Sequence, residues 1–127
     1  MSHGAFATAI NCMDGRTQLP VIEWMKRRYQ VDYVDTITEP GPVKILVEAT
    51  DATALESIKR RVEISIGKHG STRLAIVAHA DCAGNPTDDD TQLHQLRSAA
   101  TTVISWGMGV QIDLLWIGDD WQVERVG

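Results

Sequence analysis

The sequence is short of cysteine, of long apolar runs and of positive charge, and each shortage excludes a class of protein. Two cysteines among 127 residues are too few for a disulfide-stabilised secreted scaffold. No segment approaches the roughly 20 apolar residues of a membrane-spanning helix, and residues 1–6 lack the pattern of a secretory signal. A net charge of −5 disfavours nucleic acid and anionic lipid as partners. We therefore expect a cytoplasmic protein that binds neither nucleic acid nor a membrane.

Internal repeats, low-complexity tracts and flexible linkers are also missing. The composition, 43% hydrophobic and 23% charged, is that of an ordinary globular protein with one hydrophobic core. We expect a single domain over residues 1–127. In a reducing compartment, its two cysteines are better candidates for metal binding or reactivity than for a disulfide bond.

Apolar periodicity predicts strands and helices in alternation along the chain. The strands are predicted at residues 5–11, 33–38, 74–78 and 112–117. The helices are predicted from Pro20 to Gln30, from Thr53 to Ile66 and from residues 88–90 to Val103. This order is typical of an α/β fold with a central, mainly parallel sheet of about four strands flanked by helices. Residues 122–126 suit an additional antiparallel edge strand.

Local signals define the predicted ends of these elements. Pro20 suits a first helical turn, and Thr53 with Glu56 three residues later has the pattern of a capping box. The acidic run at residues 88–90 suits a helix N-cap and lacks the ligand spacing of a calcium loop. Residues 43–48 suit a further short extended segment.

Three residues with metal-binding side chains follow two of the predicted strands. Cys12 comes directly after the first strand, and His79 and Cys82 follow the third. Parallel α/β sheets place ligands at the carboxyl ends of their strands, so the three side chains can converge. Two thiolates and one imidazole form a ligand set that suits Zn²⁺. They leave a fourth position open, where bound water becomes a nucleophile near neutral pH.

Asp14 and Arg16 lie two and four residues beyond Cys12. The Asp14 carboxylate can reach either a metal-bound water or the metal itself, and Arg16 can pair with it and keep it ionised. Taken singly, these residues have simpler interpretations, because cysteine and histidine occur in cores and Asp-Gly-Arg suits a turn. Their joint arrangement at the ends of two strands favours the metal site.

The pattern Cys12-x-Asp14-x-Arg16 followed by His79-x-x-Cys82 resembles the zinc and catalytic-dyad motifs of β-carbonic anhydrases. The similarity extends beyond the motifs. Residues 64–66 and 74–84 resemble a helix, the central strand and the metal turn of that family, in order, and residues 115–118 resemble its last strand. The chain most resembles a shortened, carbonic anhydrase-like group.

The resemblance implies a role for each of the five residues. Cys12, His79 and Cys82 would bind one Zn²⁺, and Asp14 with Arg16 would orient a zinc-bound hydroxide for attack on CO₂. The product would be bicarbonate, so the implied enzyme is a carbonate dehydratase, a zinc lyase. In some family members the aspartate is instead a fourth zinc ligand, and Asp14 suits either role. The family also implies a homodimer or a higher homo-oligomer.

Two departures from the family leave other functions open. The chain is shorter than typical members, and residues 38–42 replace an Arg-x-Ala-Gly-Asn-type segment that helps to build the family's substrate pocket. The alternatives are a non-catalytic module that binds zinc or bicarbonate, a hydrolase of a small CO₂-like molecule, and a metal-free protein with a reactive thiol.

The remaining histidines and most tryptophans have no expected role in the site. No motif includes His3, His69 or His94. Packing in the core or in a hairpin is expected for Trp106, Trp116 and Trp121, rather than stacking on a ligand.

Overall fold

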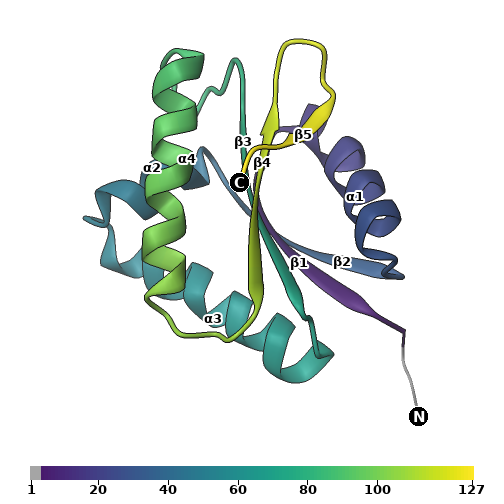
Figure 1. Cartoon of the computed structure of the whole chain (residues 1–127). Coiled ribbons are helices and arrows are strands. Elements are labelled where there is room, and N and C mark those ends of the chain that lie inside the picture. The colour runs from purple at the N-terminus through teal and green to yellow at the C-terminus, as the bar shows by residue number, and fades with distance from the viewer. Residues whose placement is uncertain (1–3) are drawn as a thin grey trace.

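Five strands form one sheet in the order β2-β1-β3-β4-β5 (Figure 1) in the computed structural model, which describes residues 4–127. The strands are β1 (Phe6–Cys12), β2 (Tyr33–Glu39), β3 (Arg73–His79), β4 (Gln111–Ile117) and β5 (Val123–Arg125). The first four are parallel, and β5 pairs antiparallel with β4. This sheet confirms the predicted α/β class and its antiparallel edge. His3 lies outside the described residues.

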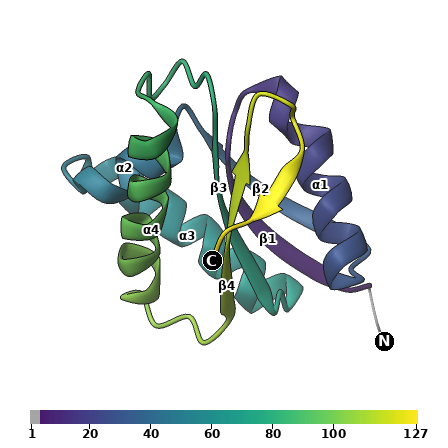
Figure 2. The same ribbon diagram turned by 45° about the horizontal axis from the view of Figure 1, so that its top comes forward.

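Four helices cover the two faces of the sheet. They are α1 (Gly15–Tyr29), α2 (Pro42–Glu48), α3 (Ala52–His69) and α4 (Asp89–Ile104). α1 lies on one face, and the other three lie on the opposite face (Figures 1 and 2). On β3, Ala75 and Val77 pack in the cluster that contains α1 residues, whereas Leu74 and Ile76 pack with α3 and α4. Both faces of this central strand are buried, which explains its continuous apolar sequence.

Aspartate side chains cap the first turn of three helices. Asp14 Oδ1 accepts the backbone N–H of Arg16 (2.9 Å), and Asp51 Oδ1 accepts that of Ala54 (3.0 Å). Asp88 caps α4 in the same way. These bonds satisfy N–H groups that have no partner inside the helix. The cap at Asp88 agrees with the predicted start of α4.

The predicted starts of the other two long helices are wrong by a few residues. α1 begins at Gly15, and Pro20 lies inside it, because the cap is Asp14 and residues Thr17 and Val21 already pack against the sheet. α3 begins before Thr53 because its cap is Asp51, so the Thr53 and Glu56 pattern does not mark the start.

Residues 43–48, expected to be extended, form most of α2. Pro42 occupies the first helical position, where a missing N–H costs nothing and its fixed φ suits the helix. Val43 and Leu46, one helical turn apart, are both buried. Periodicity alone does not distinguish a short apolar helix from a strand, and here the tertiary packing selects the helix.

The carboxyl ends of β1 and β3 lie side by side at one end of the sheet, because these two central strands pair in parallel with Ile10 opposite Ile76. The loop after β2 lies over this carboxyl end. A Cβ atom on Gly84, in the loop after β3, would lie only 2.5 Å from the carbonyl carbon of Pro40, so the two loops contact through their backbones. Among residues 4–127, no helix has the length and apolar character needed to cross a membrane.

Candidate metal centre

Cys12, His79 and Cys82 come together at the carboxyl ends of β1 and β3. Cys12 is the last residue of β1, His79 is the last residue of β3, and Cys82 follows in the loop. All three are buried, and their ligand atoms lie within 4.8 Å of one another. The topology thus brings together the three residues predicted as metal ligands, although the two cysteines are 70 positions apart in sequence.

The spacing of the two thiols fits one zinc ion. Sγ of Cys12 and Sγ of Cys82 lie 3.8 Å apart. Two sulfurs that each bind a tetrahedral Zn²⁺ at about 2.3 Å are separated by roughly the same distance. Two thiols and an imidazole are also donors that zinc prefers, so the residues present fit this metal.

His79 has the tautomer and the free nitrogen of a metal ligand. Its Nδ1 lies 2.7 Å from the backbone carbonyl oxygen of Ala80, which can only accept, so Nδ1 carries the proton. Nε2 is buried and has no hydrogen-bond partner within the described residues. An orphaned acceptor of this kind is costly unless something binds it. Histidines that bind a metal through one ring nitrogen commonly donate a hydrogen bond from the other, which fixes the ring.

The surroundings make the two thiols unequal. Burial raises the pKa of Cys12, but the adjacent His79 ring and the backbone N–H groups of Gly41 and Asp14 outweigh it and lower the pKa to about 7. Burial and the nearby Cys12 both raise the pKa of Cys82. Burial lowers the pKa of His79, but the nearby Cys12 thiolate and the hydrogen bond to the Ala80 carbonyl outweigh it, so the pKa is raised. Cys12 is therefore the thiol that ionises first.

Two amide side chains hold the backbone of Cys12. The backbone N–H of Cys12 donates to Oδ1 of Asn11 (2.8 Å), and Nε2 of Gln18 donates to the Cys12 carbonyl (2.8 Å). Asn11 is fully buried, and its Nδ2 has no hydrogen-bond partner within residues 4–127. Neither amide is predictable from the sequence, because no motif marks a side chain that supports the backbone of a candidate ligand.

Asp14 and Arg16 form an ion pair at the start of α1. Arg16 Nη2 donates to Asp14 Oδ2 (2.6 Å), and Arg16 Nε lies 3.1 Å from Asp14 Oδ1. The hydrogen bonds from Arg16 hold the pKa of Asp14 at about 2. Of the two alternatives that the sequence left open, this structure has the aspartate paired with arginine. The carboxylate is not among the atoms of the thiol and imidazole cluster.

Arg16 has two further partners that sequence reasoning missed. Its Nη1 donates to Oδ2 of Asp81 (3.2 Å), and its Nη2 donates to the Asp81 backbone carbonyl (3.2 Å). The ring of Trp121 lies against its guanidinium, 4.2 Å from ring centroid to Cζ. Trp121 was expected only to pack in the core or the hairpin, and instead it contacts a residue of the candidate site.

A family model described as "Putative carbonic anhydrase" matches residues 2–127. The chain belongs to this family. No match was found among curated proteins. The family assignment agrees with the resemblance that the sequence motifs carry.

Solved structures of β-carbonic anhydrases share the fold of this carbonic anhydrase-like chain. One is a carbonic anhydrase from Streptococcus mutans (TM-score 0.64, 15% identity, 95% of this chain and 81% of that chain). Another is β-carbonic anhydrase isoform I from Trichomonas vaginalis (TM-score 0.65, 14% identity, 94% and 80%). A third comes from a study of two tetrameric β-carbonic anhydrases of Sordaria macrospora (TM-score 0.56, 11% identity, 100% and 82%). At these identities the likeness shows the fold alone.

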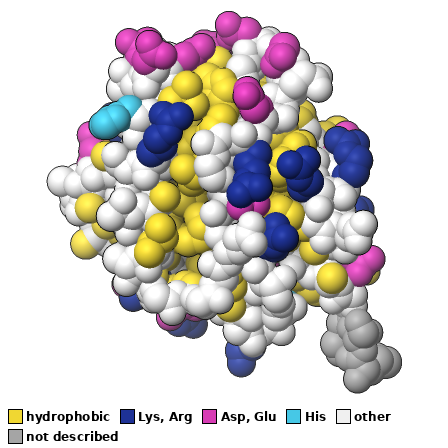
Figure 3. Space-filling model, in the orientation of Figure 1, with side chains coloured by type: hydrophobic (Ala, Val, Ile, Leu, Met, Phe, Trp, Pro, Cys, Tyr) yellow, Lys and Arg dark blue, Asp and Glu magenta, His cyan; other side chains and the backbone are white. Residues whose placement is uncertain are grey.

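Two hollows flank the cluster in this carbonic anhydrase-like chain. One, of about 210 Å³, is lined by Cys12, Met13, Asp14, Pro40, Ala83 and Gly84. The other, of about 490 Å³, is lined by Arg16, Asp81, Cys82, Ala83, Pro86, Thr87 and Asp88. The first has largely apolar walls, whereas charged residues line the second. Acidic side chains gather at the end of the molecule where α4 begins (Figure 3).

Proposed function

We propose that this chain is a zinc-dependent carbonic anhydrase that catalyses the reversible hydration of CO₂ to bicarbonate. The observation that carries the proposal is the buried cluster of Cys12, His79 and Cys82 beside an aspartate paired with arginine. The family match and the β-carbonic anhydrase fold support it.

The cluster holds Zn²⁺ through its two sulfurs and Nε2 of His79. When bound by three protein ligands, the ion keeps one open position and supplies a nucleophile from water near neutral pH. The carbonyl of Ala80 fixes the His79 ring, and the amides of Asn11 and Gln18 fix the backbone of Cys12. These contacts prepare the ligand atoms before the metal arrives.

Asp14 orients the nucleophile for attack. Its carboxylate is ionised at neutral pH because Arg16 keeps its pKa at about 2, so it accepts a hydrogen bond and cannot donate one. An acceptor in a fixed position directs a lone pair of the attacking oxygen toward the carbon of CO₂. The reaction adds one water to CO₂ and releases one proton.

The hollow of about 210 Å³ next to Cys12 receives CO₂. CO₂ is small and has no net dipole, so it suits walls formed by apolar groups such as Met13, Pro40 and Ala83. Pro40 belongs to the segment that replaces the family's usual sequence after the second strand, and this segment therefore contributes to the substrate pocket.

Replacing Asp14 with Asn tests the proposal. Asn caps a helix as well as Asp does, so α1 keeps its start, while the charge that Arg16 pairs with is lost. We expect Asp14→Asn to keep one zinc per chain and to lower CO₂ hydration by about 100-fold or more, measured by metal analysis and stopped-flow assays. The matched control is Asp51→Asn, which changes the same type of cap on α3 and should leave turnover unchanged.

The same measurements separate the alternatives. Unchanged turnover in Asp14→Asn contradicts the role of Asp14. Wild-type protein with zinc but no hydration would be a non-catalytic zinc or bicarbonate-binding module, or a hydrolase of a CO₂-like molecule. Protein with far less than one metal per chain and freely reactive thiols would be the thiol protein.

The proposal includes an assembly and a compartment. The protein forms a homodimer or a higher homo-oligomer, which is supported by exposed apolar side chains on the segment that leads from β1 into α1, Met13 (62% exposed) and Leu19 (67% exposed). It acts in the cytoplasm, where two free cysteines stay reduced and available to metal.

A further inference from the structure

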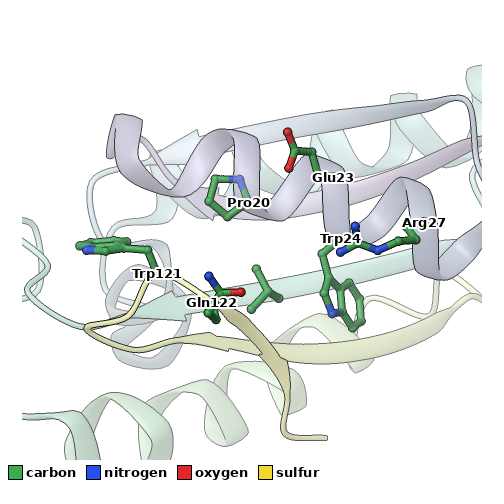
Figure 4. A pocket seen from close by; sticks show the side chains of 7 residues that line it. Pro20, Glu23, Trp24, Arg27, Trp121 and Gln122 are labelled. Atoms are coloured by element: carbon green, nitrogen blue, oxygen red, sulfur yellow. The ribbon is translucent and has the colours of Figure 1, made fainter.

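Trp121 lies between the C-terminal hairpin and the start of α1. Its ring centroid lies 4.2 Å from Cζ of Arg16 and 6.0 Å from the ring centroid of His79. The side chain comes from the loop between β4 and β5 and closes one end of a hollow of about 240 Å³ beside α1, with Trp24 farther along the same helix (Figure 4). One tryptophan thus contacts both the dyad arginine and a predicted metal ligand.

The loop holds this ring in place at a conformational cost. Trp121 has φ of 57°, a left-handed conformation that is a true outlier for a bulky residue. Its backbone N–H donates to the carbonyl of Gly118 (3.0 Å), and Oδ1 of Asp120 accepts the N–H of Gln122 (3.0 Å). Such strain persists where the surrounding structure fixes the residue, and it often accompanies function.

Arg16 needs external contacts to hold one geometry. Its side chain is 48% exposed, and a long exposed side chain loses rotamer freedom when it forms an ion pair. Asp14 and Asp81 bind edges of the guanidinium through its nitrogens, and Trp121 contacts it as a ring–cation pair. The aromatic contact limits the motion that the in-plane hydrogen bonds leave free.

We propose that Trp121 is a positioning residue that holds the Arg16 guanidinium in the orientation in which it forms the ion pair with Asp14. Its ring keeps Nε and Nη2 of Arg16 directed at the carboxylate, so that Asp14 stays paired with arginine rather than moving to the metal. The consequence for catalysis rests on the proposed function, whereas the positioning of Arg16 by Trp121 is a property of the folded chain.

Side-chain NMR of Arg16 in the full-length protein, as purified, tests this proposal. The Nε–H of Arg16 donates to both oxygens of Asp14 (3.1 and 3.2 Å), which should slow its exchange with water. The resonance is assigned by its loss in Arg16→Lys. In Trp121→Leu we expect exchange about two- to fivefold faster, as loss of one partly exposed cation–π contact allows. Trp121→Phe keeps an aromatic face and should restore most of the protection.

Trp24→Leu is the matched control. Trp24 is a half-buried tryptophan whose ring lies near a different arginine, with Arg28 Cζ 5.3 Å from the ring centroid. This variant should leave the Arg16 exchange rate unchanged. The proposal is overturned if Trp121→Leu exchanges at the wild-type rate, or if Trp24→Leu accelerates exchange equally. If Trp121→Leu does not fold, two other results would overturn the proposal. One is exchange of the Arg16 Nε–H at the wild-type rate in Trp121→Ala, and the other is loss of its protection from exchange in Trp121→Phe.

CO₂ hydration by the wild-type protein separates this proposal from the proposed function. Faster Arg16 exchange in Trp121→Leu together with an inactive wild type supports the positioning of Arg16 by Trp121 and contradicts the carbonic anhydrase activity. An active wild type with unchanged Arg16 exchange in Trp121→Leu supports the activity and contradicts the positioning role. If both proposals hold, Trp121→Leu should lower the hydration rate while Trp24→Leu should not.

Discussion

At the scale of single residues, the two thiols of the cluster differ although both are buried to a similar degree. Contacts with His79 and with backbone groups lower the pKa of Cys12 to about 7, whereas burial and the neighbouring Cys12 raise the pKa of Cys82. A cysteine binds zinc as the thiolate, so protons compete with the metal at both sulfurs. Zinc binding at the proposed site should therefore depend on pH.

We expect zinc affinity to rise with pH across neutrality. Above pH 7 Cys12 is mostly ionised before metal arrives, while Cys82 must still release a proton; below pH 7 both thiols carry protons that zinc must displace. Each protonated thiol weakens binding by about tenfold per pH unit, so the fall should steepen as the pH drops below 7. Competition with a chromophoric chelator at pH 6, 7 and 8 measures this. An affinity that does not change over this range would contradict the assignment of the thiols as ligands.

The sequence identifies some residues of the site much better than others. Cys12, Asp14 and Arg16 lie close together in one motif, and His79 and Cys82 in another, so spacing alone marks them. Trp121 is 105 positions from Arg16, and their contact depends on the turn that gives Trp121 a left-handed backbone. No local pattern predicts such a contact.

At the scale of elements, the loops after β2 and β3 pack against each other at the carboxyl end of the parallel strands, where the cluster lies. Gly84 approaches Pro40 and Gly41 so closely that there is no room for a side chain. Pro40, on one side of this contact, lines the hollow next to Cys12, and Gly84 lines it too. The close contact therefore sets the width of that hollow.

We expect Gly84→Ala to damage this region. The new Cβ would lie 2.5 Å from one backbone atom of Pro40 and 2.7 Å from another, so the loops must separate, at a cost of about 1–3 kcal/mol in the free energy of unfolding. The control is Gly67→Ala, at an exposed position in the last turn of α3, where the new Cβ would meet no atom of another part of the structure within 4 Å. That change should stabilise the protein by about 0.5–1 kcal/mol. Urea unfolding of both variants measures the difference, and equal stabilities would contradict it.

The order of strands and helices is predictable from the sequence, but helix ends are less so. Buried strands such as β3 give continuous apolar runs, and α4 has an acidic cap that is visible in the sequence. The start of α1 and the whole of α2 depend on packing instead. Val43 and Leu46 are buried at helical spacing, yet a seven-residue apolar segment fits a strand equally well until its neighbours are known.

At the scale of the whole molecule, the sheet has an open edge at β2, which lies at the end of the strand order. Tyr33, at the start of β2, is 53% exposed, and Leu19 and Met13 are exposed near the end of β1. Exposed strand edges and apolar side chains favour association with another copy.

We expect light scattering to give a molar mass of at least twice the 14.0 kDa of one chain. Leu19→Lys should lower the mass toward that of a monomer, because it places a charge on the apolar surface proposed to be covered. Ile104→Lys is the control, since Ile104 is exposed to a similar degree (62%, against 67% for Leu19) but lies at the far end of α4. A wild-type mass of 14.0 kDa would contradict the oligomer.

The proposed metal ligands lie in two distant parts of the chain, and this has a consequence for biosynthesis. Cys12 leaves the ribosome early, while His79 and Cys82 follow only after all of β1, α1, β2, α2 and α3 has been made. The complete ligand set forms when β3 docks beside β1, so a nascent chain that ends before β3 offers zinc a single thiol. If the proposed zinc site is correct, zinc acquisition is a late event in maturation, and the rate of zinc uptake should report when the centre of the sheet has assembled.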